Sequence, residues 1–176
     1  MKVLARRFNI YLALAFLLGL ACGCQTSKQE KEVGALRVHI EVSPDPAGTS
    51  QNISMLRSDP VLVTIKREPI LTEANIVTAK VIDARGGFAI EIKFDENGTW
   101  LLEQYTAANP GRHFAIFGQW SEKPVAARWL AAPIITHRIA DGVLAFTPDC
   151  SREEADQLVL GLNNFVKSTH HKGWFK

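Results

Sequence analysis

Residues 77–94, VTAKVIDARGGFAIEIKF, constrain the fold of this chain more than any other stretch. Two runs in which apolar and polar residues alternate flank the pair Gly86 and Gly87, and this alternation is typical of strands with one buried face. Adjacent glycines between such runs favour a tight turn, because glycine accepts the positive φ angles that hairpin turns need. The stretch therefore predicts an antiparallel hairpin whose buried face carries Phe88, Ile90, Ile92 and Phe94.

Shorter stretches predict further strands and the breaks between them. The predicted strands are residues 36–42 (LRVHIEV), 60–70 (PVLVTIKREPI), 112–117 (RHFAIF) and two short strands around Asp141-Gly142 within residues 136–147. Residues 43–54 hold two prolines and a glycine, which indicates a break, and residues 71–76 predict a short turn capped by Thr72. Residues 118–135 are predicted to form a long connection into a strand.

Two segments predict amphipathic helices. Asp95 is a typical N-cap residue, and Pro110-Gly111 ends the first helix. Ser151 and Glu154 form a capping box that opens the second helix. The apolar face of the first helix carries Leu101, Leu102, Tyr105, Ala108 and Asn109, and that of the second carries Ala155, Leu158, Val159, Leu162, Phe165 and Val166. Two helices packed on one face of a mainly antiparallel sheet make an α+β fold.

The residues most suggestive of catalysis are Glu103 and His113. Glu103 falls on the outer face of the predicted helix, whereas His113 begins the next strand, and their spacing does not bring them together. We therefore expect no enzyme and no cofactor. We expect no metal site either, because His170 and His171 are adjacent and no further ligand follows at a useful spacing.

The N-terminus predicts a secretory signal peptide. Three cations precede an uncharged run at residues 8–21, which is shorter than the roughly 20 residues of a membrane-spanning helix. The run ends in LGLACGCQTS, where a small residue twice precedes a cysteine, and this is similar to the lipobox of bacterial lipoproteins. Lipidation at Cys24 is the preferred interpretation. Cys22 remains an alternative, and so does an ordinary secretory signal cut nearby.

The predicted organisation is a signal peptide at residues 1–23, a flexible tether at 24–34, one domain at 35–167 and a flexible tail at 168–176. The signal holds three of the 20 basic residues and none of the 18 acidic ones, so the mature chain is nearly neutral. The sequence pI of about 8.5 therefore arises from the signal and indicates no nucleic-acid partner.

Cys150 is the one cysteine within the predicted domain. We expect it to be buried and inert. A disulfide between Cys150 and Cys24 remains open only if Cys22 is the lipidated residue.

Several short motifs follow one another in a fixed order. They are Leu71-Thr72, Asp95-Glu96-Asn97-Gly98, Asn109-Pro110-Gly111, Ala132-Pro133-Ile134-Ile135 and Ser151-Arg152-Glu153-Glu154-Ala155. In this order and spacing, residues 69–163 resemble the head subdomain of the first large periplasmic domain of the protein-export subunits SecD and SecDF. The resemblance implies the same α+β fold and a non-catalytic periplasmic module that contacts emerging or unfolded polypeptide.

The chain also departs from that family. No transmembrane helix is expected after the signal, so proton-coupled pulling on a preprotein is not expected. The connection after Phe117 is longer than the family's tight hairpin. The family's base subdomain is expected to be absent, although residues 36–42 could stand in for part of it.

Three tryptophans are the candidate partner surface. Trp100 lies on the outer face of the first helix, where an aromatic side chain is costly unless something covers it. Either the connection that carries Trp120 and Trp129 folds over it, or the three form a protein-binding patch. We expect a lipid-anchored protein of the bacterial envelope that faces the periplasm and binds polypeptide, or alternatively a scaffold that binds one folded envelope protein.

Overall fold

The computed structural model describes residues 34–56, 60–120 and 125–172 of the chain, with side chains up to Thr169. The predicted signal peptide lies outside the described residues, as do both candidate lipidation sites, Cys22 and Cys24. Of the predicted tether only Gly34 is described. Because Gly34 is buried, the folded domain begins at least one residue before the predicted boundary.

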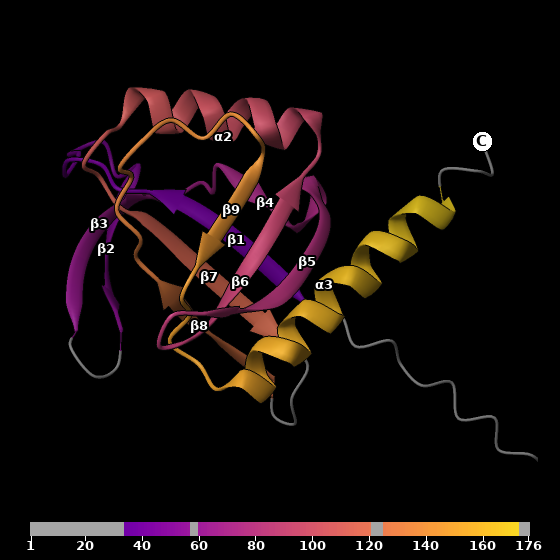
Figure 1. Cartoon of the computed structure of the whole chain (residues 1–176). Coiled ribbons are helices and arrows are strands. Elements are labelled where there is room, and N and C mark those ends of the chain that lie inside the picture. The colour runs from indigo at the N-terminus through magenta and orange to yellow at the C-terminus, as the bar shows by residue number, and fades with distance from the viewer. Residues whose placement is uncertain (1–33, 57–59, 121–124, 173–176) are drawn as a thin grey trace, which may run out of the picture. The chain divides into compact units, whose positions relative to one another are not determined.

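Nine strands lie within the described residues. They are β1 (Ala35–Ile40), β2 (Ser50–Met55), β3 (Val61–Lys66), β4 (Leu71–Thr72), β5 (Ile76–Ala84), β6 (Gly87–Phe94), β7 (Phe114–Trp120), β8 (Ala126–Ala131) and β9 (Val143–Phe146). They form a four-stranded sheet in the order β4-β1-β7-β8, a three-stranded sheet in the order β5-β6-β9, and a separate β2-β3 hairpin (Figure 1). All of these pairings are antiparallel.

The predicted hairpin at residues 77–94 is confirmed. Ala84 pairs with Gly87 at its end, so the turn consists of Arg85 and Gly86. Ile90 and Ile92 of β6 are fully buried, as alternation predicted for this face. Because β6 pairs with β5 on one side and β9 on the other, this strand is the centre of its sheet.

Both predicted helices are present, and their caps form as expected. They are α2 (Glu96–Ala108) and α3 (Arg152–Lys172), with a short 3-10 helix, η1 (Glu73–Asn75), after β4. The N–H of Gly98 donates to the Asp95 carboxylate at 2.7 Å, which caps α2. At the start of α3, Glu154 N donates to Ser151 Oγ at 3.2 Å, and Ser151 N donates to Glu154 Oε2 at 2.7 Å. This reciprocal pair is the predicted capping box.

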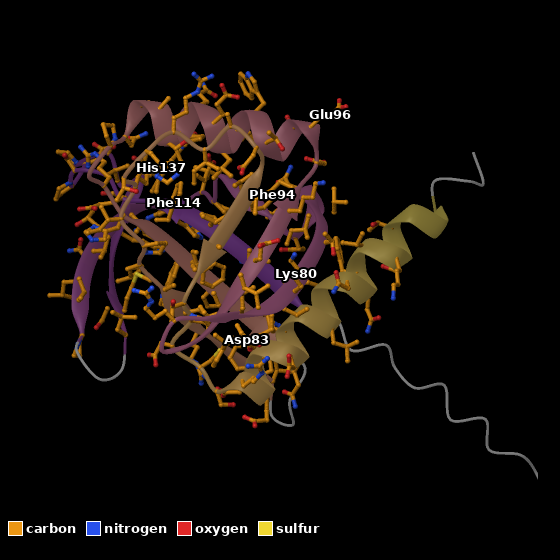
Figure 2. The ribbon with its side chains drawn as sticks, viewed as in Figure 1. Lys80, Asp83, Phe94, Glu96, Phe114 and His137 are labelled. Atoms are coloured by element: carbon orange, nitrogen blue, oxygen red, sulfur yellow. The ribbon has the colours of Figure 1, made fainter. Side chains whose placement is uncertain are left out.

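The helices and the two larger sheets enclose one apolar core. Leu102 of α2 and Leu158 of α3 are both fully buried in it, and Phe94 and Phe114 point into it from two different sheets (Figure 2). The β2-β3 hairpin covers the opposite face of the four-stranded sheet with a smaller cluster of Met55, Val63, Ile65 and Ala115. Two helices on antiparallel sheets confirm the predicted α+β class.

Two strands lie where the sequence predicted a break and a long connection. β2 begins at Ser50, directly after the turn-forming prolines and Gly48, so only the first part of residues 43–54 is a loop. The strand predicted to end at Phe117 continues to Trp120 and pairs with β8. The two strands form a hairpin, so the prediction of a simple long connection there was wrong.

The segment before β9 also differs from the prediction. Residues 136–140 are not a strand, because Ile139 N donates to Thr106 Oγ1 of α2 at 3.0 Å instead of to a neighbouring strand. The predicted tail begins too early, since α3 continues to Lys172. Ser168 and Thr169 fit into this helix because their hydroxyls donate to backbone carbonyls one turn back.

Candidate functional site

The structure does not bring the three predicted tryptophans together. Trp120 is 1% exposed in the main core, with the Arg128 guanidinium 5.0 Å from its ring centre. Trp129 packs edge-on against Phe117 beside the smaller cluster. Trp100 is 59% exposed. The prediction of one patch made by Trp100, Trp120 and Trp129 was therefore wrong, because β7 and β8 turn the latter two toward packed interiors.

Trp100 lies at a shallow groove on the outer face of α2. The groove has a volume of about 220 Å³ and is lined by Trp100, Glu103, Gln104, Ala107 and Arg138. The first four are residues of the helix, whereas Arg138 comes from the loop before β9. This groove combines an exposed aromatic ring, a small apolar residue and polar side chains, and such a mixture suits contact with another polypeptide.

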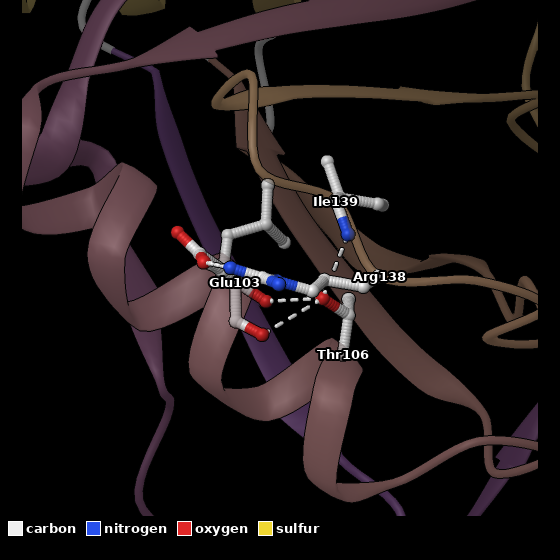
Figure 3. Close-up of polar contacts among 5 residues, drawn as sticks. Glu103, Thr106, Arg138 and Ile139 are labelled. Atoms are coloured by element: carbon white, nitrogen blue, oxygen red, sulfur yellow. Dashed lines mark hydrogen bonds and ion pairs between the residues drawn. The ribbon is translucent and has the colours of Figure 1, made fainter.

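Two contacts fasten the loop before β9 to α2 (Figure 3). The Arg138 guanidinium forms an ion pair with the Glu103 carboxylate. Thr106 Oγ1 accepts from Ile139 N at 3.0 Å and donates to the Leu102 carbonyl at 2.7 Å. Thr106 is buried, so its hydroxyl is fully used within the protein. Sequence reasoning missed this residue, because a threonine in an amphipathic helix gives no sign of a partner more than thirty positions away.

A second groove is lined by the same loop and by β9. Its volume is about 530 Å³, and its lining consists of residues 137–141 and 143–145. Arg138 belongs to the lining of both grooves. The loop before β9 therefore lines both grooves. Trp100, this loop and β9 together form the candidate binding surface.

The candidate acid and base, Glu103 and His113, are not paired with each other. His113 Nδ1 instead lies 2.7 Å from Glu41 Oε2, and His113 N donates to the same oxygen at 2.8 Å. Partial burial raises the pKa of Glu41, but the hydrogen bonds from His113 and the charges of His113 and Arg112 outweigh it and lower the pKa below its ordinary value. Among the described residues, no hydroxyl or thiol forms a hydrogen bond with Glu41 or His113. The two residues connect the segment just after β1 to the segment just before β7.

Glu41 should make the fold sensitive to acid. A carboxyl whose pKa is lower in the folded state stabilises the fold fully above its unfolded pKa, near 4.5. This contribution disappears as pH falls through the lower folded pKa. The free energy of unfolding should therefore fall less steeply below about pH 4.5 in Glu41→Gln than in the wild type. At pH 7 the variant should cost about 1 kcal/mol or less, because the Glu41 side chain is 30% exposed. Urea denaturation at several pH values measures both effects, and an unchanged acid slope would contradict the assignment.

Cys150 does not line either groove of this surface. Cys150 is half-buried against the main core, whereas a buried side chain was expected. The side chains of His170 and His171 lie outside the described residues. Within the described part of the chain, no three His, Cys, Asp or Glu side chains group as metal ligands. No helix among the described residues is long and apolar enough to cross a membrane.

The fold and this surface define an antiparallel α+β module with an exposed aromatic ring beside two open grooves. The chain belongs to the family of the SecDF P1 head subdomain, which matches residues 50–164. The match starts at β2, earlier than the predicted start at Pro69, and ends one residue after the predicted end at Asn163. The β2-β3 hairpin is therefore part of the family's fold, and the predicted resemblance is confirmed.

One solved SecDF structure has a similar fold, and two others match at lower scores. The first, described as a membrane component that enhances protein export, has a TM-score of 0.52 and 20% sequence identity, and the alignment covers 76% of this chain and 64% of that chain. SecDF in a super-membrane-facing form has a TM-score of 0.47 and 15% identity over 89% of this chain and 33% of that chain. SecDF from Thermus thermophilus, a translocon-associated membrane protein, has a TM-score of 0.40 and 15% identity over 90% and 34%. No curated protein matches the chain.

Proposed function

We propose that this chain is a non-catalytic lipoprotein of the bacterial envelope that binds nonnative polypeptide in the periplasm and assists protein export without proton coupling. The observation that carries this proposal is the exposure of Trp100 at a groove on α2, within a fold of the SecDF P1 head family. The lipid anchor in the proposal rests on the similarity of LGLACGCQTS to a lipobox, with Cys24 as the preferred site and Cys22 as the alternative.

The chemistry around Trp100 supports polypeptide as the ligand. An indole ring offers a large apolar face with little loss of side-chain entropy on binding, and such residues dominate the binding energy of many protein interfaces. The adjacent Gln104 is exposed and can bond to backbone amides of varied sequence. A surface of this kind recognises extended chain in general, as a protein with many clients requires.

The polar groups near the surface also support a binding role. The Glu103 carboxylate is held by Arg138, and Thr106 by backbone groups, so both position the loop. His113 bonds to Glu41 instead of to a group in either groove. Glu103 and His113, the two residues considered for acid–base chemistry, therefore each hold another part of the fold in place.

Site-specific crosslinking in cells tests the proposal. A photoreactive amino acid at Gln104, beside Trp100, should crosslink to a broad smear of secreted proteins. The same amino acid at Arg85, which is exposed in the turn between β5 and β6, is the control position. Trp100→Glu should reduce the smear at position 104 by about tenfold or more, since removing a central aromatic contact commonly costs 2 kcal/mol or more.

Each other outcome has a definite meaning. One discrete crosslinked partner would favour the scaffold that binds a single folded envelope protein. No crosslinks beyond those at position 85 would contradict polypeptide binding at this surface. An undiminished smear from a folded Trp100→Glu variant would show that Trp100 contributes nothing to it.

A further inference from the structure

Within the described residues the strand β9 is the edge of its sheet, and β6 is the strand with which it pairs (Figure 1). Backbone groups of an antiparallel strand point alternately to one neighbour and to the other side. Phe94 N donates to the Gly142 carbonyl at 3.0 Å, and alternation then makes Leu144 the next residue bonded to β6. The backbone groups of Val143 and Ala145 therefore point away from β6, toward the outer edge.

Part of this outer edge has no internal partner. Val143 N donates to Asp141 Oδ1 at 3.1 Å. In the part of the chain that the structure describes, neither the N–H nor the C=O of Ala145 has a hydrogen-bond partner, and Ala145 is exposed. Three strand groups are thus available at this edge: the Val143 carbonyl and both backbone groups of Ala145.

The opposite edge of the same sheet is blocked at one residue by a side chain of α3. Ala79 of β5 corresponds to Ala145, since its backbone also points outward. There the side chain of Asn163 on α3 accepts from Ala79 N at 3.1 Å and donates to the Ala79 carbonyl at 2.9 Å. Proteins commonly block exposed strand edges in this way, because an open edge pairs with other chains. Ala145 has no such blocking side chain within the described residues, so the two edges of this sheet differ at these corresponding positions.

The outer edge of β9 is unpaired because the loop before it packs on α2 and does not form a neighbouring strand. The sequence of this loop alternates well enough to predict a strand that would pair with β9. Instead, Thr106 and Glu103 hold the loop on α2 through Ile139 and Arg138. The diverted loop and β9 border the groove of about 530 Å³.

We infer that an extended segment of nonnative polypeptide adds to the outer edge of β9 as a further strand of the sheet. This inference rests on the function proposed above and names how the client is held. Backbone hydrogen bonds give affinity with little dependence on sequence, and the groove accepts alternate side chains of the added strand. Arg138 lines both grooves, so a client bound at β9 that extends past the loop can also contact Trp100.

Proline at position 145 tests this mode of binding with little disturbance of the sheet. The Ala145 N–H takes no part in the β6-β9 ladder, so Ala145→Pro removes an outward donor and leaves the ladder bonds in place. Ser54→Pro on β2 is the matched control, because the Ser54 N–H also points away from its partner strand. With the full chain in detergent and a reduced, carboxymethylated unfolded protein as probe, Ala145→Pro should bind about tenfold more weakly and Ser54→Pro as the wild type does.

Hydrogen exchange of the wild-type chain provides a measurement that needs no variant. The Ala145 amide should exchange about tenfold more slowly when the unfolded probe is bound, because it then donates to the added strand. An unchanged exchange rate in the bound state would overturn strand addition, and so would equal binding by a folded Ala145→Pro variant, while the proposed function would stand. If the wild-type chain does not bind the probe at all, the proposed function itself fails.

Discussion

Trp120→Ala is expected to lower the free energy of unfolding by about 3–5 kcal/mol. The side chain is 1% exposed and belongs to the main core, so its removal deletes buried apolar surface and leaves a cavity next to β8. A domain of this size has a total stability of only about 5–15 kcal/mol, so the variant should be partly unfolded under mild conditions. Urea denaturation followed by far-ultraviolet circular dichroism measures the loss.

Trp100→Ala is the matched control for Trp120→Ala. The same change of residue type at a side chain that is 59% exposed should alter stability by about 0.5 kcal/mol or less. Similar costs at the two positions would contradict the assignment of Trp120 to the core and Trp100 to the surface. The contrast also separates the two roles, since only the Trp100 variant should affect polypeptide binding in a folded protein.

The different fates of these tryptophans show where sequence reasoning worked. The helical angle of Trp100 depends only on residues of its own helix, and its place on the outer face was predicted from that angle. The sequence left open whether the connection that carries Trp120 and Trp129 covers it, and the ring is 59% exposed. Trp120 continues the two-residue period of Phe114, Ile116 and Gly118. Because glycine interrupts the apolar pattern, the strand was predicted to end at Phe117, three residues before the end of β7. Local caps and the β5-β6 hairpin were predicted for the same reason as Trp100, because their interactions span only a few residues.

The features that were missed depend on contacts between distant parts of the chain. Glu41 and His113 bond across 72 positions, and Ile139 and Thr106 across 33. Periodicity cannot reveal such partners. The open edge of β9 is of the same kind, because it exists only where the sheet order, the register and the diverted loop are all known.

Gly142→Ala is expected to cost about 2–4 kcal/mol, the second large effect. Gly142 has a φ of 71°, which an L residue adopts at a cost of about 1 kcal/mol or more. An added Cβ would also lie 2.1 Å from Thr99 Oγ1 and 3.0 Å from Thr99 Cβ, so α2 and the turn before β9 would have to separate. Overpacking of this kind adds about 1–3 kcal/mol. Urea denaturation of the variant gives the sum.

Two further variants divide that cost into its causes. Gly86→Ala has a similar φ of 87° with nothing within 4 Å of the added Cβ, so it should show the backbone strain alone, about 1 kcal/mol. In the Thr99→Ala background, Gly142→Ala should lose most of its overpacking cost, because the substitution removes Thr99 Oγ1 and Cγ2 and leaves only Cβ, at 3.0 Å. If Gly142→Ala and Gly86→Ala lowered the free energy of unfolding equally, the Thr99 side chain would be able to move away from the added Cβ without loss of stability. A coupling of about 1 kcal/mol or more would instead show that the first turn of α2 fixes where β9 begins, and with it the position of the open edge.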